Sequence, residues 1–443
     1  MQAQSGSAVG YMSIGRAARR CMLFGIMAVF FLLSVVVSVI LPPRQGPDES
    51  EHYNYVRSIA KDFRLPSPSA DRVSVSTDVV HRPPLYYSLA AVPFALADAI
   101  FEQRGAPLRA VRLFGAFVGL LWVYFSYRLA RQLFPKDDLA CLFCTAFASW
   151  LPPIVYFSGV VADQVTVGAF FAGSLWMTIR FVQTGLPRLV DAVLFGLLLG
   201  LAILAGDQAL ILVPVAVVAV PFALRRQEGP HRHTVWRTAA VALLTALVVS
   251  MWWFVRNRVV YGLWIVHPGH EPMIAGGWLG LASHAAASLG LLYRLGISLF
   301  ANFWSPFDFA TAAIVQSRLY LTLMSVYTAV GLCGIMIFLF VTRGDRQAEE
   351  PMDRGDILLI LALAFFLLAG AIYWHTALVD RNTIYKGYLL LPAAGPVGAV
   401  LVAGYRGLSS ARRTQIRLMA FAVAVIVVLN TISLLAIWSR YSY

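Results

Sequence analysis

Acidic residues stand directly after the first hydrophobic stretch of the chain, in the segment GPDESEHYNYVRSIAKDF at 46–63. Asp48, Glu49 and Glu51 are followed at once by His52, so several ionisable side chains lie close to the expected membrane surface. Partial desolvation at such a surface disfavours the charged form of a carboxyl group, so acids placed there need a reason. The segment is therefore a candidate edge of an active site, where a carboxylate acts as a general base.

A helix that begins near Pro47 gives this segment two distinct faces. Residues three, four and seven positions apart share one side of a helix, and that side would carry Asp48, Glu51, His52 and Tyr55. An apolar stripe suited to the membrane surface would be formed by Val56, Ile59 and Phe63. Proline at the first helical position and acids in the first turn are also typical of any helix start, so ordinary capping remains an alternative for some of the acids.

A second group of chemically useful residues occurs in HRPPLYY, residues 81–87. His81 and Arg82 precede a Pro-Pro pair and two aromatic residues, Tyr86 and Tyr87. A guanidinium at a lipid interface is well suited to hold a phosphate whose tail lies in the bilayer. The alternative is an interfacial aromatic belt with a snorkelling arginine.

Three further segments contribute an acid and several cations. Asp163 lies in SGVVADQ at the expected end of a span, where capping of a helix is the alternative to catalysis. Cations and an aromatic residue follow in WWFVRNRVVYG and DRNTIYKGYLLLP, and they are Arg256, Arg381, Lys386 and Tyr388. Asp207, in LAGDQAL, reaches the same expected surface. Acids and phosphate-binding cations from distant segments are thus predicted to share one side of the membrane.

The elements that position these residues are predicted to be transmembrane helices. The chain is 59% hydrophobic and 13% charged, and its mean hydropathy is +0.72. Many apolar runs are about 20 residues long, the length needed to cross a bilayer, which predicts an all-α integral membrane protein of about 11 spans. The expected spans are 21–41, 107–133, 138–155, 163–181, 190–206, 208–224, 235–254, 317–342, 356–376, 384–405 and 415–437.

Basic residues give the orientation of these spans. The net charge is +13, and with the N-terminus inside most arginines fall in the inner loops, as the positive-inside rule requires. The basic balance therefore reflects orientation and anionic lipid, and no nucleic-acid partner is expected. Two apolar stretches, 84–101 and 285–303, break this parity as full spans and are predicted to be juxtamembrane or re-entrant helices. They lie in two outer loops, 42–106 and the aromatic 255–316, of a single polytopic domain over 1–443.

Taken in chain order, these segments resemble the GT-C glycosyltransferases, in particular the superfamily of protein O-mannosyltransferases and lipid A aminoarabinose transferases. The segments that carry the resemblance are PDE at 47–49, HRPPLYY, RLFGAFVGLLWVYFSYRLARQLF, SGVVADQ, LAILAGDQALILVP, WWFVRNRVVYG and IYKGYLLLP. Two positions depart from the family pattern. Asp207 stands where the family often has lysine, and Lys386-Gly387-Tyr388 replaces Gly-Arg-Tyr.

The resemblance implies a GT-C type helix bundle that transfers a sugar from a polyprenyl-phosphate-sugar donor to an acceptor hydroxyl. Asp48 is expected to be the general base, and Glu49 or Asp163 to position the acceptor, with inversion at the sugar carbon. Groups expected to bind the donor phosphate are His81, Arg82, Arg256 and Lys386. Residues expected to line the substrate site are His52, Tyr55, Tyr86, Tyr87, Arg381 and Tyr388.

The location and partners follow from the same resemblance. A multi-pass protein of the bacterial inner membrane is expected, with the active site at the periplasmic face. The acceptor could be a glycan, a lipid or a protein, and the sugar a hexose or a pentose. No cofactor is expected, because a phosphate-linked sugar needs no metal. A divalent ion is the alternative, held by His267, His270 and Glu271 or bridged by Asp48 and Asp163.

Two other classes of protein compete with the enzyme. A transporter or lipid flippase usually places its charged site near the bilayer midplane, at broken helices and often with repeat symmetry. The charges of this chain instead cluster at one predicted interface. A membrane scaffold without catalytic activity leaves the acids unexplained.

Overall fold

The computed structural model describes residues 14–67, 79–103, 105–226, 231–266, 289–304, 318–341, 362–370, 387–409 and 411–442. These residues form helices and no strands. The helices are α1 (Arg16–Ile40), α2 (Glu49–Asp62), α3 (Leu85–Ile100), α4 (Ala106–Leu133), α5 (Asp138–Ser149), α6 (Pro152–Ser158), α7 (Gln164–Thr184), α8 (Leu189–Ala205), η1 (Asp207–Ile211), α9 (Leu212–Arg226), α10 (His231–Tyr261), α12 (Leu289–Trp304), α14 (Arg318–Val341), η3 (Gly387–Ala393), α16 (Ala394–Gly407) and α17 (Arg412–Tyr441).

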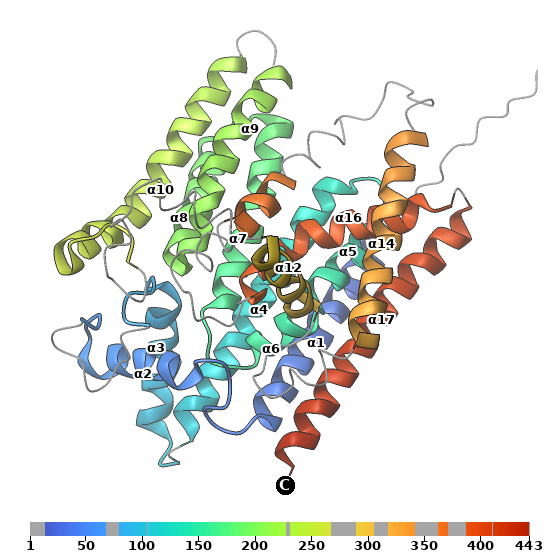
Figure 1. Cartoon of the computed structure of the whole chain (residues 1–443). Coiled ribbons are helices and arrows are strands. Elements are labelled where there is room, and N and C mark those ends of the chain that lie inside the picture. Colours follow the sequence, from blue (N-terminus) through green and yellow to red (C-terminus); the bar gives the residue numbers. More distant parts are fainter. Residues whose placement is uncertain are drawn as a thin grey trace, which may run out of the picture.

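The predicted all-α membrane bundle is confirmed (Figure 1). Seven helices of the described chain are long and apolar enough to cross a membrane, or eight if α5 and α6 form one bent span. The predicted count of about 11 is not confirmed. α8 belongs to a class of shorter apolar helices, together with α3 and the Thr322–Gly334 part of α14. Of the predicted span 356–376, only 362–370 is described, and it is helical.

The predicted span 138–155 is broken in its second half. α5 ends at Ser149 and α6 begins at Pro152, with a 60° bend between them. Proline lacks an N–H and clashes with the preceding turn, so the Pro152-Pro153 pair begins a new helix instead of continuing the old one. The bend lets α6 lead into the segment 159–163, which carries Asp163 to the site described below.

The stretch predicted at 84–101 as a helix of the first outer loop is α3, and it packs between α2 and α4. Its outward face is apolar and exposed, at Leu89, Val92, Leu96 and Ile100. The prediction that an apolar stripe of α2 lies on the membrane surface is wrong for Val56, which is fully buried inside the protein. α3 covers that side of α2, and only Phe63, 90% exposed, remains free of the protein.

Ion pairs link the basic loops that are predicted to lie inside. Asp138 accepts hydrogen bonds from Arg19 at 3.0 Å and Arg131 at 2.5 Å, and Asp137 pairs with Arg406 at 3.4 Å. The N-terminal end of α1, the α4–α5 connection and the end of α16 therefore meet at one end of the bundle. α2 and α3 lie toward the opposite end, at the lower left of Figure 1.

Candidate active site

Asp48 is presented to solvent at the entrance to α2. It occupies the N-cap position in the left-handed region, with φ 50° and ψ 18°, and its side chain makes no capping hydrogen bond. A non-glycine residue in this conformation is uncommon, although Asp tolerates it better than most. The exposed carboxylate makes no hydrogen bond or ion pair with any described residue. It is therefore accessible to a substrate, and the capping alternative does not describe it.

Glu49, the next residue, is fully buried and paired with Arg112 of α4. Arg112 donates from Nε to Oε1 and from Nη2 to Oε2 of the carboxylate, both at 2.7 Å. The two carboxylate oxygens also accept the backbone N–H groups of Val161 and Gly46, at 3.1 and 3.2 Å. The predicted contact of Glu49 with the acceptor stays a prediction, and this geometry favours a role in holding the site together.

Asp163 stands before α7, and its side chain also makes no capping hydrogen bond. Instead its oxygens accept hydrogen bonds from Arg82 Nη1 at 3.1 and 3.3 Å and from the Tyr87 hydroxyl at 3.4 Å. Burial alone would raise the pKa of this carboxyl, but the charge of Arg82 outweighs burial and holds the pKa below its ordinary value. Asp163 is therefore ionised at neutral pH and fixed against the guanidinium.

His52 extends this network from the buried face of α2. Its Nδ1 lies 2.7 Å from the Tyr87 hydroxyl. Burial, followed by the nearby charge of Arg82, lowers the pKa of His52 from 6.5 to about 4, although Asp163 and Asp48 act in the opposite direction. Tyr55 stacks on Tyr87 with ring centroids 4.0 Å apart. His52 is thus neutral at physiological pH and, 3% exposed, supports the site from behind.

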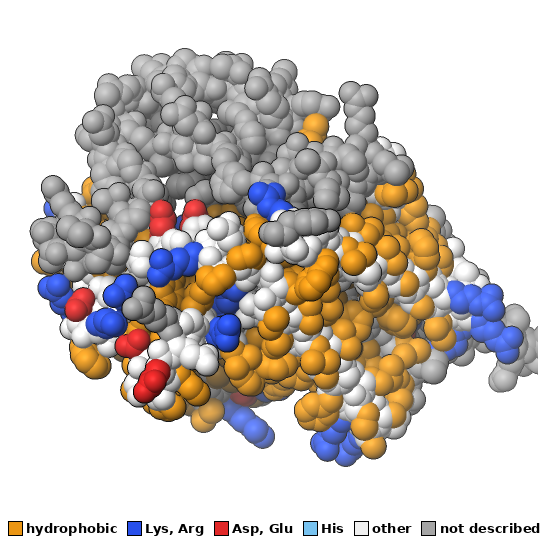
Figure 2. Space-filling model, turned by 90° about the horizontal axis from the view of Figure 1, so that it is seen from below, with side chains coloured by type: hydrophobic (Ala, Val, Ile, Leu, Met, Phe, Trp, Pro, Cys, Tyr) orange, Lys and Arg blue, Asp and Glu red, His pale blue; other side chains and the backbone are white. Residues whose placement is uncertain are grey.

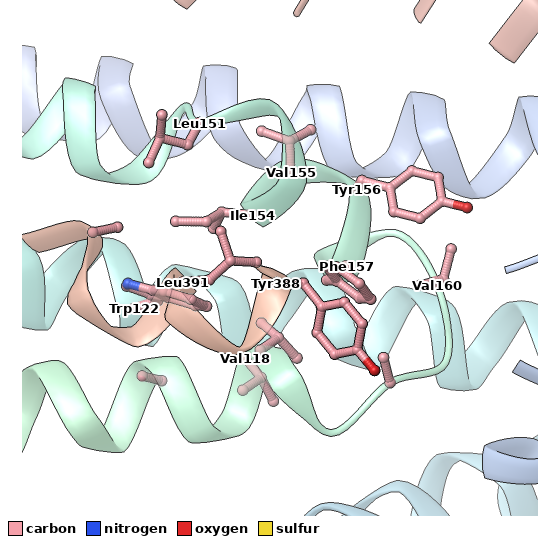
Figure 3. Packing of buried hydrophobic residues seen from close by; sticks show 14 of the residues in the cluster. Val118, Trp122, Leu151, Ile154, Val155, Tyr156, Phe157, Val160, Tyr388 and Leu391 are labelled. Carbon is pink, nitrogen blue, oxygen red and sulfur yellow. The ribbon is translucent and has the colours of Figure 1, made fainter. Parts of the chain in front are cut away.

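Tyr388, at the start of η3, reaches the same network from the far end of the chain. Its ring centroid lies 5.1 Å from that of Phe157, and its hydroxyl points away from Leu391 and Trp122 (Figure 3). The guanidinium of Arg82 interacts with that hydroxyl. Asp207 lies within electrostatic reach of both Arg82 and Asp163. Arg82 is therefore the cation around which residues from α3, α7, η1 and η3 are gathered.

Arg256 reaches the first outer loop from the last turns of α10. It donates to the Pro66 carbonyl at 2.6 Å, and its guanidinium lies over the rings of Trp253 and Tyr261 at 4.9 and 5.9 Å. Tyr261 donates to the Val80 carbonyl at 3.3 Å. These contacts bring the predicted cation to the segment that precedes Arg82.

The remaining predicted residues divide into buried ones and ones outside the described chain. His81 and Tyr86 are 6% and 0% exposed, beside Arg82 and Tyr87. Arg381 and Lys386 lie outside the described residues, as do His267, His270 and Glu271 of the alternative metal site. Within the described ranges, no three His, Cys, Asp or Glu side chains cluster closely enough to hold a metal ion.

Seen from below, toward the end with α2 and α3, charged side chains gather at the left over these two helices (Figure 2). Apolar side chains cover much of the remaining coloured surface. The site thus lies where the bundle changes from a lipid-compatible surface to a charged one, as a membrane interface requires.

Comparison with known proteins agrees with this arrangement. The family model of dolichyl-phosphate-mannose-protein mannosyltransferases matches residues 81–253, a range that includes Arg82, Arg112 and Asp163. Among solved structures, the oligosaccharyltransferase of Archaeoglobus fulgidus with zinc and sulfate matches at TM-score 0.54 and 18% identity, over 94% of this chain and 53% of its own. The chain has the GT-C glycosyltransferase fold. The predicted resemblance to that superfamily is confirmed.

A second archaeal structure agrees with this result. The archaeal oligosaccharyltransferase AglB from the same organism, in complex with an inhibitory peptide and a dolichol-phosphate, gives TM-score 0.55 and 15% identity, covering 96% of this chain and 56% of that one. This GT-C chain thus spans just over half the length of both archaeal proteins. ArnT from Cupriavidus metallidurans, bound to undecaprenyl phosphate, gives TM-score 0.43 and 15% identity, over 89% and 78% of the two chains. No curated protein matches the sequence significantly.

Proposed function

We propose that this protein is a glycosyltransferase that moves a sugar from a polyprenyl-phosphate-sugar donor to an acceptor hydroxyl. The observation that carries the proposal is that Asp48 and the Arg82–Asp163 pair all lie within electrostatic reach of Tyr388, at one end of a GT-C bundle. The Asp48 carboxylate is exposed and makes no hydrogen bond or ion pair with any residue that the structure describes. Two comparisons support a lipid-linked donor: the matching family model is named for dolichyl-phosphate-mannose, and the AglB structure contains a dolichol-phosphate.

Asp48 is the general base of the proposed reaction. It removes the proton of the acceptor hydroxyl while that oxygen forms a bond to the anomeric carbon of the donor sugar. The bond from this carbon to the phosphate oxygen breaks, and the lipid phosphate leaves with an additional negative charge. Attack opposite to the leaving group inverts the sugar carbon, by analogy with inverting sugar chemistry.

Arg82 is the proposed partner of the departing phosphate. Positioned cations lower a barrier most where charge develops in the transition state, and Arg82 is held by Asp163 with 19% of its side chain still exposed. Arg256 and Lys386 would add positive charge from α10 and from the segment before η3. Tyr388 and Asp163 would line the substrate site, while the buried His52, Tyr55 and Tyr87 would support these groups.

The protein would act as a multi-pass enzyme of the bacterial inner membrane, with α2 and α3 at the periplasmic face. The transferred sugar would be a hexose or a pentose, and the acceptor a glycan, a lipid or a protein. The proposed chemistry needs no metal, because the leaving group is already a phosphate and its charge is balanced by arginine.

Substitution of Asp48 tests the proposal. Asp48→Asn keeps the shape of the side chain but removes the base, and we expect transfer to fall by roughly 10²–10⁴-fold. Asp62→Asn, at the exposed other end of α2, is the matched control and should retain full activity. Transfer is followed by mass spectrometry of envelope glycans and lipids from cells with and without the protein. Near-normal transfer by Asp48→Asn would remove the base assignment, and uptake of a substrate into vesicles without a glycosidic product would favour a transporter.

A further inference from the structure

Arg112 uses its whole hydrogen-bonding capacity inside the protein. Its side chain is 3% exposed, and Nη1 donates to the carbonyls of Ser38 at 2.9 Å and Leu41 at 2.7 Å. Nη2 donates to the Pro42 carbonyl at 2.9 Å and to Glu49, and Nε donates to Glu49 as well. A guanidinium has five N–H donors, and these five contacts account for all of them.

The Glu49 carboxylate is equally saturated. Each oxygen accepts one hydrogen bond from Arg112 and one from a backbone N–H, that of Val161 for Oε1 and that of Gly46 for Oε2. A carboxylate offers about four lone-pair positions, so none is left for a substrate. Packing is also tight at this point, because a Cβ on Gly46 would lie 3.1 Å from Glu49 Cβ and 3.2 Å from Val160 Cβ.

The pair joins three segments that carry or border the acids of the site. Its carbonyl partners belong to the end of α1 and the turn after it, where backbone carbonyls lack helical partners. Glu49 directly follows Asp48, and the Val161 N–H lies two residues before Asp163. One buried ion pair thus links the segment that carries Asp48 to the segment that carries Asp163.

We infer that Glu49 and Arg112 are positioning residues, which fix the general base Asp48 relative to the Arg82–Asp163 pair without touching substrate. The inference rests on the proposed function for its catalytic consequence, but its structural part stands independently. Because Arg112 also binds three carbonyls, the pair differs from a simple ion pair. Exchanging the two side chains, as Glu49→Arg with Arg112→Glu, would leave the Ser38 and Leu41 carbonyls without the donors that Arg112 supplies and would not restore the site.

Glu49→Gln tests the inference with two measurements. The first is hydrogen–deuterium exchange of the purified protein, for which we expect faster exchange in both 41–52 and 159–163 and no change in α8 to α10. The second is kinetics: a displacement of the base of about 1 Å lowers kcat by roughly 10²-fold, whereas KM for the donor should change by less than about threefold. Asp98→Asn, which breaks the half-exposed 3.7 Å pair with Lys61 between α2 and α3, is the matched control and should change neither.

A double-mutant cycle separates positioning from direct contact with substrate. If Glu49 acts only through Asp48, adding Glu49→Gln to Asp48→Asn should reduce the residual transfer little further, whereas independent roles give multiplying losses. Multiplying losses, or faster exchange in 41–52 without 159–163, would overturn the inference.

If Glu49→Gln does not accumulate, Arg112→Lys provides the same tests, since it keeps the charge but has fewer donors. The hydrogen–deuterium exchange measurement tests the positioning role even if the protein transfers no sugar. Failure of the proposed function can therefore be distinguished from failure of this inference.

Discussion

Two acids at helix N-termini show how local sequence rules and the structure diverge at single residues. Asp48 precedes α2 and Asp163 precedes α7, and Asp is a preferred N-cap residue because its side chain can accept a backbone N–H. Neither side chain does so here. Asp163 binds Arg82 and Tyr87 instead, and Asp48 stands exposed in the left-handed region. Helix capping therefore accounts for neither acid, and both remain candidates for a role in catalysis.

A pH-dependent contribution to stability is expected from His52. Its pKa is about 4 in the folded protein and 6.5 in the unfolded chain, so between these values the unfolded state binds more protons. Above pH 6.5, His52 is neutral in both states and does not change the free energy of unfolding. As the pH falls from 6.5 toward 4, the unfolded state takes up the proton first, so the folded state loses stability. At pH 5 the loss amounts to roughly 2 kcal/mol.

Thermal unfolding in detergent at pH 7.5 and 5.0 measures this effect. The change in Tm from pH 7.5 to pH 5.0 should be more negative for the wild type than for His52→Gln, which keeps a polar partner for Tyr87 but does not titrate. All other titrating groups are common to the two proteins and cancel in this comparison. The exposed His233 on α10 is the control, and His233→Gln should behave as wild type. Equal shifts in wild type and His52→Gln would contradict the assignment. Asp163 does not interfere, because its lowered pKa places its titration below this range.

The sequence identified most ionisable residues of the site but not their partners. Asp48, Arg82 and Asp163 were recognisable because charged residues near a membrane are expensive. Arg112 was missed, although it lies within the predicted span 107–133, where a charged side chain is equally costly. That it pairs with Glu49 was not visible, because 63 positions separate the two and nothing local specifies the contact.

At the scale of elements, apolar length predicted the helices better than it predicted which ones cross the membrane. The stretches expected at 84–101 and 285–303 are helices at Leu85–Ile100 and Leu289–Trp304. The bend between α5 and α6 was not anticipated, although Pro152-Pro153 was its visible cause. The apolar face of α2 was assigned to the membrane because its cover, α3, is a tertiary contact that periodicity does not reveal.

Close packing of α8 on α10 depends on two glycines four residues apart, Gly196 and Gly200. A Cβ on Gly200 would lie 2.8 Å from Val249 Cβ and 3.0 Å from the Ala246 carbonyl oxygen. Small residues at this spacing let membrane helices approach closely, and no hydrophobic effect in lipid compensates for their loss. We expect Gly200→Leu to push the helices apart and to destabilise the protein by roughly 1–3 kcal/mol, as overpacking of a tight interface does.

The control for this prediction is Gly25→Leu in α1, where a Cβ meets nothing within 4 Å. Both substitutions add the same apolar side chain to a span, so propensity and hydrophobicity are matched. The Tm and the amount of folded protein after detergent extraction provide the readout. A loss for Gly25→Leu as large as that for Gly200→Leu would show that packing against α10 is not the cause.

On the scale of the whole molecule, ion pairs that connect loops and the charged residues of the candidate site lie at opposite ends of the bundle. Ion pairs at one end, such as Asp138 with Arg19 and Arg131, tie basic loops to each other. At the other end, Arg82 faces Asp163, and the exposed Asp48 makes no ion pair within the part of the chain that the structure describes. The separation agrees with the orientation inferred from the basic loops, and it was accessible from sequence because loop charge, unlike packing, depends only on the order of the segments.

Labelling of introduced cysteines tests this orientation directly. Phe63→Cys lies 90% exposed after α2, and Arg413→Cys lies exposed at the start of α17. The exposed native Cys21 and Cys333 are first replaced by alanine. In intact spheroplasts we expect a membrane-impermeant maleimide to react with Phe63→Cys alone, and with both variants after permeabilisation. Labelling of Arg413→Cys in intact spheroplasts, with Phe63→Cys protected, would place the Asp48 site in the cytoplasm and exclude a periplasmic acceptor.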